Sequence, residues 1–543
     1  MVTRSKAGIF KPKALSIEAV AYEPSMVEEA LADSAWRLPV QAEYDALINN
    51  STWEIVPLPS GRKAIGCKWL FKINKNLDET ITQRKARLVA KGCSQVPGCD
   101  FQETFSLVVK PAIIRTILFV VVSRGWQIRQ VDVNNAFLND DLTDEVYMQQ
   151  PPGYVQFGPN KKLVCRLTKA LYGLCQASRA WFDKLKKFLV CTGFLVSKSN
   201  ASLFIRVTTE PILYVLVYVD NIIVTGSMAA SITSFIQLLD KEFSLKDMGD
   251  LHYFLGIEVI RSSSGSLHLC QQKYIRELLD RSNLNNAKSV HTPMISSSAL
   301  SKDEGDRLAD PTEYRSLAGA LQYVARLDIA YAVNRVYQFM HAPTTVHFVA
   351  LKQILRYLRG TIDHGLIFRP SDRLSLVGYA DANWGLDFDD SHSTTRYCVY
   401  FGHTLVSWCS KKQQTVSRST AEAKYRSLAV ATTVVANPVL HSKFKHVELD
   451  LFFVREKVAQ DALAVGEVPA CDQVADIFTK PLSVSLFARF RNLLRVLPIE
   501  KLGETSQVVI VSYILPVSFY NSTPTPSSAA AIEADASSSV RFF

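Results

Sequence analysis

Two aspartates stand where apolar, strand-like segments meet small polar residues. Asp132 lies near the end of one predicted strand, and Asp220 and Asn221 separate the apolar runs 212–219 and 222–225. Magnesium prefers hard oxygen ligands from one or two carboxylates together with substrate phosphates. Two such ions ~3.5–4 Å apart can activate an attacking hydroxyl and stabilise a leaving oxygen. If the strands are neighbours in one sheet, Asp132 and Asp220 would form a two-metal site for phosphoryl transfer.

The elements around these residues also allow a plainer interpretation. The two apolar runs predict a β-hairpin with Asp220 and Asn221 at its tip. Taken alone, that hairpin favours an ordinary turn residue over a metal ligand. The hypothesis of a metal site therefore depends on Asp132, upstream in the chain.

A second hairpin is predicted to be strongly basic. Its first strand alternates, with Cys67 and Trp69 on one face and Lys68 and Lys72 on the other, and segment 84–91 returns the chain. Lysines on a solvated strand edge discourage aggregation. The functional alternative is a flap that contacts phosphates.

Composition indicates a globular protein with an acidic partner. The 543 residues, enough for two to four domains, are 48% hydrophobic and 21% charged, with a net charge of +10. Nucleic acid is the commonest acidic partner, and a merely basic surface is the alternative. The ten cysteines form no C-x-x-C pair, which argues against a zinc site and a disulfide framework.

Targeting signals are not evident in the sequence. No apolar run approaches the ~20 residues of a membrane span. The basic N-terminus lacks the apolar core of a signal peptide. We therefore expect a soluble intracellular protein, cytoplasmic or nuclear or both, with no membrane partner.

Several motifs together carry a family resemblance. They have the order and approximate spacing of reverse transcriptase motifs, and they are Gln130–Leu138, Ala170–Ala177, Tyr218–Asn221 and His252–Glu258. From about Ser34 to Pro293 the chain resembles the reverse transcriptase of copia-type LTR retrotransposons. The later segment from Tyr379 to Lys480 resembles the ribonuclease H that follows it in the same Pol polyprotein.

The resemblance implies an α+β fold: a right-hand polymerase of fingers, palm and thumb, followed by a truncated RNase H-like α/β domain. With the resemblance giving the reverse transcriptase (34–295) and a degenerate RNase H-like domain (371–485), composition predicts an N-terminal tether (1–33), a linker and helical connection (296–370) and a low-complexity tail (486–543).

The resemblance also implies an RNA-directed DNA polymerase. Asp132 and Asp220 would hold two Mg²⁺ (or Mn²⁺) ions, with Asn221 beside them. The partners would be an RNA or DNA template with its primer and deoxynucleotides, and the oligomeric state stays open. The implied substrate contacts are Arg87 on the triphosphate, Phe137 excluding a ribose 2′-hydroxyl, Gln176 along the sugar and template, and Tyr253–Gly256 gripping the primer. Taken singly, Phe137 could be core, Gln176 a helix cap and Arg87 a surface charge.

Departures from the family pattern put activity in question. Asn221 stands where the family has a second aspartate, so polymerase activity is expected to be reduced. In the RNase H-like segment Asp381, Glu422 and Asp476 remain, but Lys424 replaces a glutamate. A strand that carries a further aspartate is missing near 429–438. We expect ribonuclease H activity to be lost. The alternative function is a catalytically inactive, element-derived nucleic-acid-binding protein, or a pseudogene product.

Overall fold

The computed structural model describes residues 22–75, 81–102, 104, 109–139, 141–157, 163–198, 200–207, 211–295, 300–372, 375–385, 389–436, 458–460, 463–466, 468–503 and 540–542. The chain separates into two compact units. The first comprises Met1–Ser106 and Asn135–Lys187, and the second comprises Leu107–Asn134 and Phe188–Phe543. Helices and strands are mixed in both, in agreement with the predicted α+β class.

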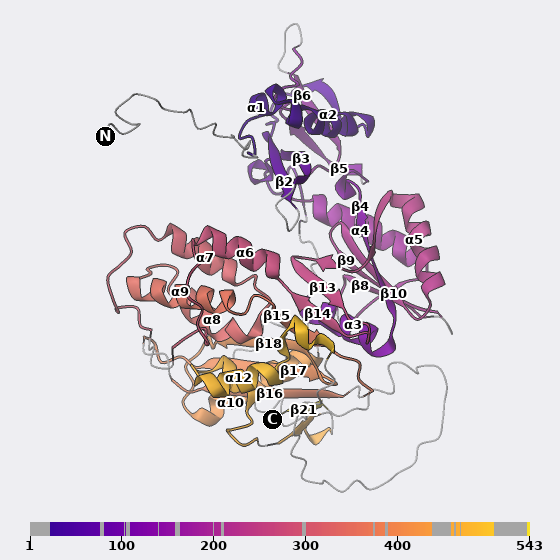
Figure 1. The fold of residues 1–543 in the computed structure, drawn as a ribbon. Coiled ribbons are helices and arrows are strands. Elements are labelled where there is room, and N and C mark those ends of the chain that lie inside the picture. The colour runs from indigo at the N-terminus through magenta and orange to yellow at the C-terminus, as the bar shows by residue number, and fades with distance from the viewer. Residues whose placement is uncertain are drawn as a thin grey trace, which may run out of the picture. The chain divides into compact units, whose positions relative to one another are not determined.

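The first unit combines helices with two small antiparallel sheets (Figure 1). Its helices are α1 (Val27–Ala32), α2 (Ser34–Asn49) and most of α4 (Ala177–Cys191). One sheet has the order β1 (Trp53–Pro57), β6 (Leu163–Lys169), β5 (Asp141–Met148). The other is the hairpin of β2 (Cys67–Lys75) and β3 (Ile81–Ala90).

The basic hairpin is confirmed with its predicted faces. Cys67 and Trp69 are buried, and Lys68 and Lys72 are exposed. The buried face packs toward helix α2, where the ring of Trp36 meets Phe71 edge-on at 5.4 Å between centroids. Lys68 and Lys72 lie on the opposite face, which also carries Arg87, because strand side chains alternate between the two faces of a hairpin.

The second unit begins with helix α3 (Pro111–Arg124) and a six-stranded sheet. The strand order is β11 (Leu245–Asp250), β4 (Gln127–Val133), β10 (Asn221–Gly226), β9 (Ile212–Tyr218), β8 (Leu203–Val207), β7 (Leu195–Val196). Helix α5 (Ala229–Phe243) packs on β10 and β4. Strands β4 and β10 are direct neighbours, as a shared metal site requires.

A five-stranded sheet and a group of helices follow. The strand order is β12 (Tyr253–Phe254), β13 (Ile257–Arg261), β14 (Leu267–Cys270), β15 (His364–Phe368), β20 (Val496–Pro498). The helices are α6 (Gln272–Arg281), α7 (Thr312–Leu321), α8 (Ala330–Tyr337) and α9 (Thr345–Arg359), with the short 3-10 helix η4 (Leu327–Ile329). The predicted helical connection at 296–370 thus also contributes strand β15 to a sheet.

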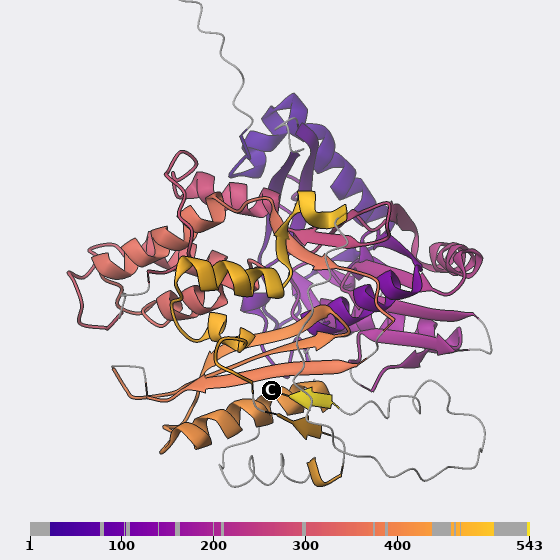
Figure 2. The same ribbon diagram turned by 60° about the horizontal axis from the view of Figure 1, so that its bottom comes forward.

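The last sheet has the order β18 (Thr404–Lys412), β17 (Thr394–Phe401), β16 (Leu376–Asn383), β21 (Val540–Phe542), β19 (Leu463–Val465). Helix α10 (Thr420–Ala436) packs on β16 and β17. Figure 2 shows β21 beside β16, in the sheet that α10 covers. The remaining elements are η5 (Val474–Phe478), α12 (Val484–Leu493) and η6 (Ile499–Gly503). The predicted boundary at 486 therefore falls inside α12, and part of the segment predicted as a tail is folded.

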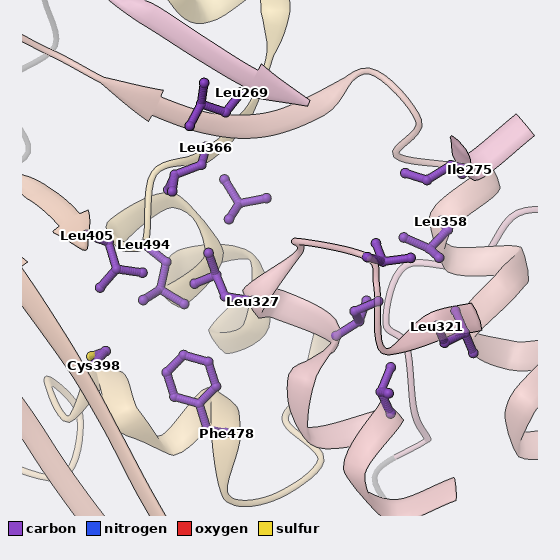
Figure 3. Close-up of a cluster of buried hydrophobic side chains, with 14 of the residues drawn as sticks. Leu269, Ile275, Leu321, Leu327, Leu358, Leu366, Cys398, Leu405, Phe478 and Leu494 are labelled. Carbon is purple, nitrogen blue, oxygen red and sulfur yellow. The ribbon is translucent and has the colours of Figure 1, made fainter. Parts of the chain in front are cut away.

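One hydrophobic core runs through the second unit. It includes side chains from helices α6 and α9, from the strands β14, β15 and β18, and from η5. Figure 3 shows Leu327, Leu358, Leu405 and Phe478 converging in this core from elements far apart in the sequence. Residues of 107–134 and 188–295, of 296–370 and of 371–485 therefore contribute to one core in this unit.

Candidate active site

The register of the central sheet brings the predicted catalytic segments together. Strands β4 and β10 are antiparallel, and Asn221 pairs directly with Asp132. The backbone N–H of Val133 donates to the carbonyl of Asp220 at 2.9 Å. Side chains of directly paired residues lie on the same face. Asp132 and Asn221 therefore occupy neighbouring positions on one face, with Asp220 one residue away.

The hairpin tip differs by one residue from the prediction. The two loop residues are Val219 and Asp220, and Asn221 is already the first residue of β10, paired with Tyr218. Val219 has φ +56°. A β-branched residue in this region is rare and costs of order 1–3 kcal/mol, which is typical of functional sites. The strained turn brings Asp220 back against β4.

Hydrogen bonds link the Asn221 amide to Gln130 and to Asp220. Gln130 Nε2 donates to Asn221 Oδ1 at 3.1 Å, and Asn221 Nδ2 donates to Asp220 Oδ1 at 3.3 Å. Gln130 is 5% exposed and lies two residues before Asp132 on β4. In this orientation Asn221 Oδ1 accepts from Gln130 and the Asn221 amino group faces the Asp220 carboxylate, while Gln130 Oε1 is buried without a hydrogen-bond partner among the described residues.

The donor set fits a divalent cation only in part. The carboxylates of Asp132 and Asp220 are the hard ligands that magnesium takes alongside substrate phosphates. An amide nitrogen is no ligand for such an ion, and in this orientation Asn221 offers its nitrogen. Asp132 and Asp220 therefore supply two carboxylates, whereas an aspartate at position 221 would add a third negative charge to attract the cation.

The predicted primer-gripping segment forms a tight turn in the same unit. Strands β12 and β13 are joined by Leu255 and Gly256, with φ +52° and +79°. Positive φ at both loop residues is the geometry of a type I′ hairpin. The ring of Phe254 meets Tyr218 of β9 edge-on at 6.3 Å between centroids. Tyr253, 42% exposed, belongs to a segment that contacts the strand leading to Asp220.

In the first unit, Arg87 and Phe137 converge on one tyrosine. The guanidinium carbon of Arg87, on β3, lies 4.4 Å from the centroid of the Tyr172 ring. The Phe137 ring contacts the same ring edge-on, with centroids 4.6 Å apart. Phe137 is 7% exposed, so most of its ring is packed in the core. The two predicted nucleotide contacts are therefore joined through Tyr172.

Gln176 is placed by internal hydrogen bonds. Its Oε1 accepts from Gln95 Nε2 at 3.0 Å, and its Nε2 donates to the carbonyl of Asp100 at 3.0 Å. The side chain is 6% exposed. It precedes helix α4, where its backbone carbonyl accepts from Arg179 and Ala180. In this arrangement Gln176 supports the loop that carries Tyr172.

Two glycines let that loop approach β3 closely. A Cβ on Gly173, which has φ +91°, would lie 2.2 Å from the carbonyl oxygen of Ala90. A Cβ on Gly92 would lie 2.1 Å from the carbonyl oxygen of Gly173. Because no other residue lacks a Cβ, only glycine permits this approach. The N–H of Ala90 donates to the carbonyl of Tyr172 at 2.8 Å and completes the junction.

The carboxylates of the RNase H-like segment are each paired with a cation. Lys424 Nζ lies 3.7 Å from Asp381 Oδ1, and Lys480 Nζ lies 2.8 Å from Asp476 Oδ2. The third carboxylate, Glu422, pairs with the guanidinium of Arg426 at 2.8 Å. Burial raises the pKa of Asp381, and Lys424 only partly opposes that rise. Within the described part of the chain no cluster of three His, Cys, Asp or Glu could hold a metal ion.

A buried arginine adds to this positive surrounding. Arg396 of β17 lies opposite Asp381 of β16 in the strand register, and its side chain is fully buried. Among the described residues its guanidinium nitrogens have no hydrogen-bond partner. Burial lowers the pKa of Arg396 to about 9, and the carboxylates of Asp381 and Asp476 oppose that change. These residues do not fit a two-metal centre, because cations occupy the surroundings of the carboxylates.

Three residues of these sites, Gln130, Tyr172 and Arg396, are not among those predicted from the sequence. Gln130 could have been found, because it shares a strand face with Asp132 and a buried polar side chain needs a hydrogen-bond partner. Tyr172 lies inside a recognised motif, but nothing in its spacing indicates what its ring would contact.

Comparisons with known proteins decide the family. Residues 50–296 match the family model of reverse transcriptase (RNA-dependent DNA polymerase). A transposon Ty5-1 protein of Saccharomyces cerevisiae is 33% identical over 299 residues, and the match covers 97% of its length and 54% of this chain. The chain belongs to the copia-type retrotransposon reverse transcriptases.

Longer members of the copia-type family match most of the chain. The retrovirus-related Pol polyprotein from transposon RE1 of Arabidopsis thaliana is 47% identical over 530 residues, which is 90% of this chain and 36% of that polyprotein. The retrovirus-related Pol polyprotein from transposon TNT 1-94 of Nicotiana tabacum is 35% identical over 504 residues, which is 84% of this chain and 38% of that polyprotein. The chain thus spans little more than a third of these copia-type polyproteins.

A solved structure of a foamy viral protease-reverse transcriptase in complex with double-stranded DNA is similar to this copia-type chain at 11% identity. Its TM-score is 0.40, and the match covers 85% of this chain and 68% of that one. None of the described helices is both long and apolar enough to cross a membrane.

Proposed function

We propose that the chain is an RNA-directed DNA polymerase whose activity is impaired by Asn221. The observation that carries the proposal is the antiparallel pairing of β4 and β10, which sets Asp132 opposite Asn221 and beside Asp220. Magnesium or manganese, when bound by Asp132 and Asp220, supplies charge neutralisation at the reacting phosphate. The partners would be a primed RNA or DNA template and deoxynucleotides.

Each unit, taken by itself, carries residues that we assign to substrate contacts. In the first, Arg87 would bind the triphosphate as a charge-assisted fork, and Phe137 would restrict space near the sugar. Gln176 would act through the loop it supports. In the second, Tyr253 and Gly256 would position the primer end. The right-hand arrangement of fingers, palm and thumb belongs to this same proposal.

Primer extension on an RNA template tests the proposed polymerase. With Mg²⁺ or Mn²⁺, the wild-type chain should extend the primer weakly, and Asp220→Ala should abolish extension. Asp303→Ala, in an exposed loop, removes one carboxylate elsewhere and should extend like wild type. Incorporation that survives Asp220→Ala unchanged would contradict the assignment of this residue to catalysis.

A second candidate function is binding of a primer–template duplex without catalysis. The hydrogen bond from Asn221 to Asp220 favours it, because the amino group occupies a carboxylate oxygen that a cation would use. The cation-paired carboxylates of the RNase H-like segment point the same way, toward a domain without ribonuclease activity. Salt-dependent duplex binding with no extension in either metal would select this function.

A further inference from the structure

A single ring joins the two residues assigned to the incoming nucleotide. Tyr172 has the guanidinium of Arg87 over its face at 4.4 Å and the edge-on ring of Phe137 at 4.6 Å. A cation over an aromatic face and an edge-to-face ring pair are both orienting contacts. Arg87 and Phe137 come from β3 and from the segment after β4, far apart in the sequence. Their spacing therefore depends on Tyr172.

The position of this ring is set by backbone contacts that do not involve its side chain. The carbonyl of Tyr172 accepts from the N–H of Ala90, and Gly173 and Gly92 allow the close approach described above. The N–H of Cys175 donates to Gln95 Oε1 at 2.8 Å, which fixes the other end of the loop. A change confined to the Tyr172 ring should thus leave the loop in place.

Within the proposed polymerase function, we propose that Tyr172 is a positioning residue that couples recognition of the nucleotide triphosphate to recognition of its sugar. The ring holds the Arg87 fork in one plane and holds Phe137 at a fixed distance from it. A nucleotide whose phosphates engage Arg87 then has its sugar presented to Phe137. Tyr172 itself contacts neither phosphate nor sugar in this scheme.

Nucleotide binding without chemistry provides the test. Wild-type protein is mixed with a primer–template whose primer ends in a dideoxynucleotide, and the dissociation constants of the matching deoxynucleotide and ribonucleotide are measured in Mg²⁺. In Tyr172→Leu we expect deoxynucleotide binding to weaken roughly tenfold, as loss of both ring contacts predicts. The ratio of ribonucleotide to deoxynucleotide dissociation constants should fall as well. Tyr172→Phe keeps both contacts and should match wild type.

A matched control comes from another stacked tyrosine of the same unit. Tyr154 stacks on Tyr44 with centroids 3.8 Å apart. Tyr154→Leu makes the same chemical change away from Arg87, and it should alter neither affinity nor the sugar ratio. If a thermal melt shows that Tyr172→Leu does not fold, Arg87→Lys takes its place. This variant keeps the charge but loses the planar contact with the Tyr172 ring, so it should lower both the deoxynucleotide affinity and the ratio of ribonucleotide to deoxynucleotide dissociation constants.

The outcomes separate this proposal from the polymerase function on which it depends. Wild-type protein that binds no nucleotide on the primer–template overturns both. Normal binding by wild type with unchanged affinity and ratio in Tyr172→Leu overturns only the role of Tyr172. A loss of affinity with an unchanged sugar ratio also overturns it, because the coupling would be absent. A Tyr172→Phe variant as weak as Tyr172→Leu would assign the effect to the hydroxyl and overturn the stacking role.

Discussion

At the scale of single residues, one amide decides how much charge the proposed polymerase site carries. Asn221 stands where the copia-type pattern has aspartate, and its side chain is held between Gln130 and Asp220. An aspartate at this position could still accept from Gln130 Nε2 through one oxygen. Its second oxygen would face the Asp220 carboxylate, where repulsion is relieved by a divalent cation.

The variant Asn221→Asp should therefore regain activity. We expect primer extension in Mg²⁺ to be faster by roughly tenfold or more, which corresponds to at least about 1.4 kcal/mol in the barrier. Asn221→Ala also breaks the bond to Asp220 but supplies no oxygen ligand, so it should show no such gain. Equal extension by the Asp and Ala variants would contradict the account.

The melting temperature tests the role of residue 221 without relying on catalysis. Asn221→Asp should melt at a lower temperature than wild type in EDTA, because two adjacent carboxylates repel. Added Mg²⁺ should raise the melting temperature of the variant more than that of wild type. Equal responses to Mg²⁺ would show that the restored carboxylate binds no ion.

The residues that carry the site were predictable to different extents. The sequence predicts Asp132 and Asp220 from their places near strand ends together with the family resemblance, and β4 and β10 are neighbours as that prediction requires. The direction of the Asn221 amide could not be predicted, because it depends on Gln130, which the register places across from Ile223. Tyr172 was missed for a similar reason: its partners come from elements that sequence spacing does not relate.

At the scale of elements, strand β21 completes a sheet that would otherwise be interrupted. Its residues pair in parallel with Val377 and Gly378 of β16 on one side and with all three residues of β19 on the other. Within the described residues β19 has no other strand partner. Without β21, β16 would present an unpaired edge, which proteins generally avoid.

Removing the segment after Gly503 should expose that edge. In a chain ending at Gly503, amides of Leu376–Asn383 and Leu463–Val465 should exchange hydrogen faster than in the full chain. Peptides from β9, whose neighbours are β10 and β8, provide the control and should be unchanged. Equal exchange in both chains would contradict the pairing of β21 with this sheet.

Sequence patterns predict the long elements and miss this short one. The apolar runs predicted at 212–219 and 222–225 are observed as β9 (Ile212–Tyr218) and β10 (Asn221–Gly226), and the predicted strand near Asp132 is observed as β4. Strand β21 has three residues and follows a Ser-, Ala- and Pro-rich stretch, so composition favours no structure there. Its place in the sheet depends on a gap between β16 and β19, which only the tertiary structure reveals.

A buried ion pair stabilises the junction between the helices and the five-stranded sheet. Arg326 binds Asp328 through two hydrogen bonds of 2.8 and 2.6 Å, and both side chains are almost fully buried. Tyr357 donates to the same carboxylate. Burial alone would raise the pKa of Asp328, but Arg326 and Tyr357 outweigh it and the pKa is lowered.

Breaking this pair should be costly. Asp328→Asn leaves Arg326 buried without its counter-charge, so we expect a loss of about 3–5 kcal/mol and a lower melting temperature. The double variant Arg326→Met/Asp328→Leu should recover much of the loss. The double variant lacks both charges of the pair. If it were no more stable than Asp328→Asn, the loss could not be due to an unpaired Arg326.

The depressed pKa also predicts how stability depends on pH. A carboxyl group whose pKa is lower in the folded state contributes stability above its unfolded pKa, near 3.9, and loses it as pH falls through the folded value. The melting temperature of wild type should thus fall more steeply below about pH 4 than that of Asp328→Asn. Arg491 also lowers the pKa of Asp328, so the variant Arg491→Met should show a weaker dependence of melting temperature on pH.

At the scale of the whole molecule, a net charge of +10 favours an acidic partner, and the β2–β3 hairpin concentrates part of it. Lys72 pairs directly with Lys85 across the two strands, on the face opposite Trp69. Like charges directly opposite each other destabilise a hairpin. A phosphate backbone on this face would relieve the repulsion, whereas a purely solvated edge would gain nothing from the pairing.

Salt dependence of duplex binding distinguishes these two roles of the hairpin. Each phosphate contact contributes about 0.9 to the slope of log affinity against log salt concentration for duplex DNA. Lys72→Ala/Lys85→Ala should therefore weaken binding and reduce the magnitude of that slope by about 1.8. The control Lys241→Ala/Lys302→Ala removes the same charge from two exposed positions in the other unit and should change the slope much less. Equal slopes for the two double variants would show that only net charge matters and that the hairpin is a solvated edge.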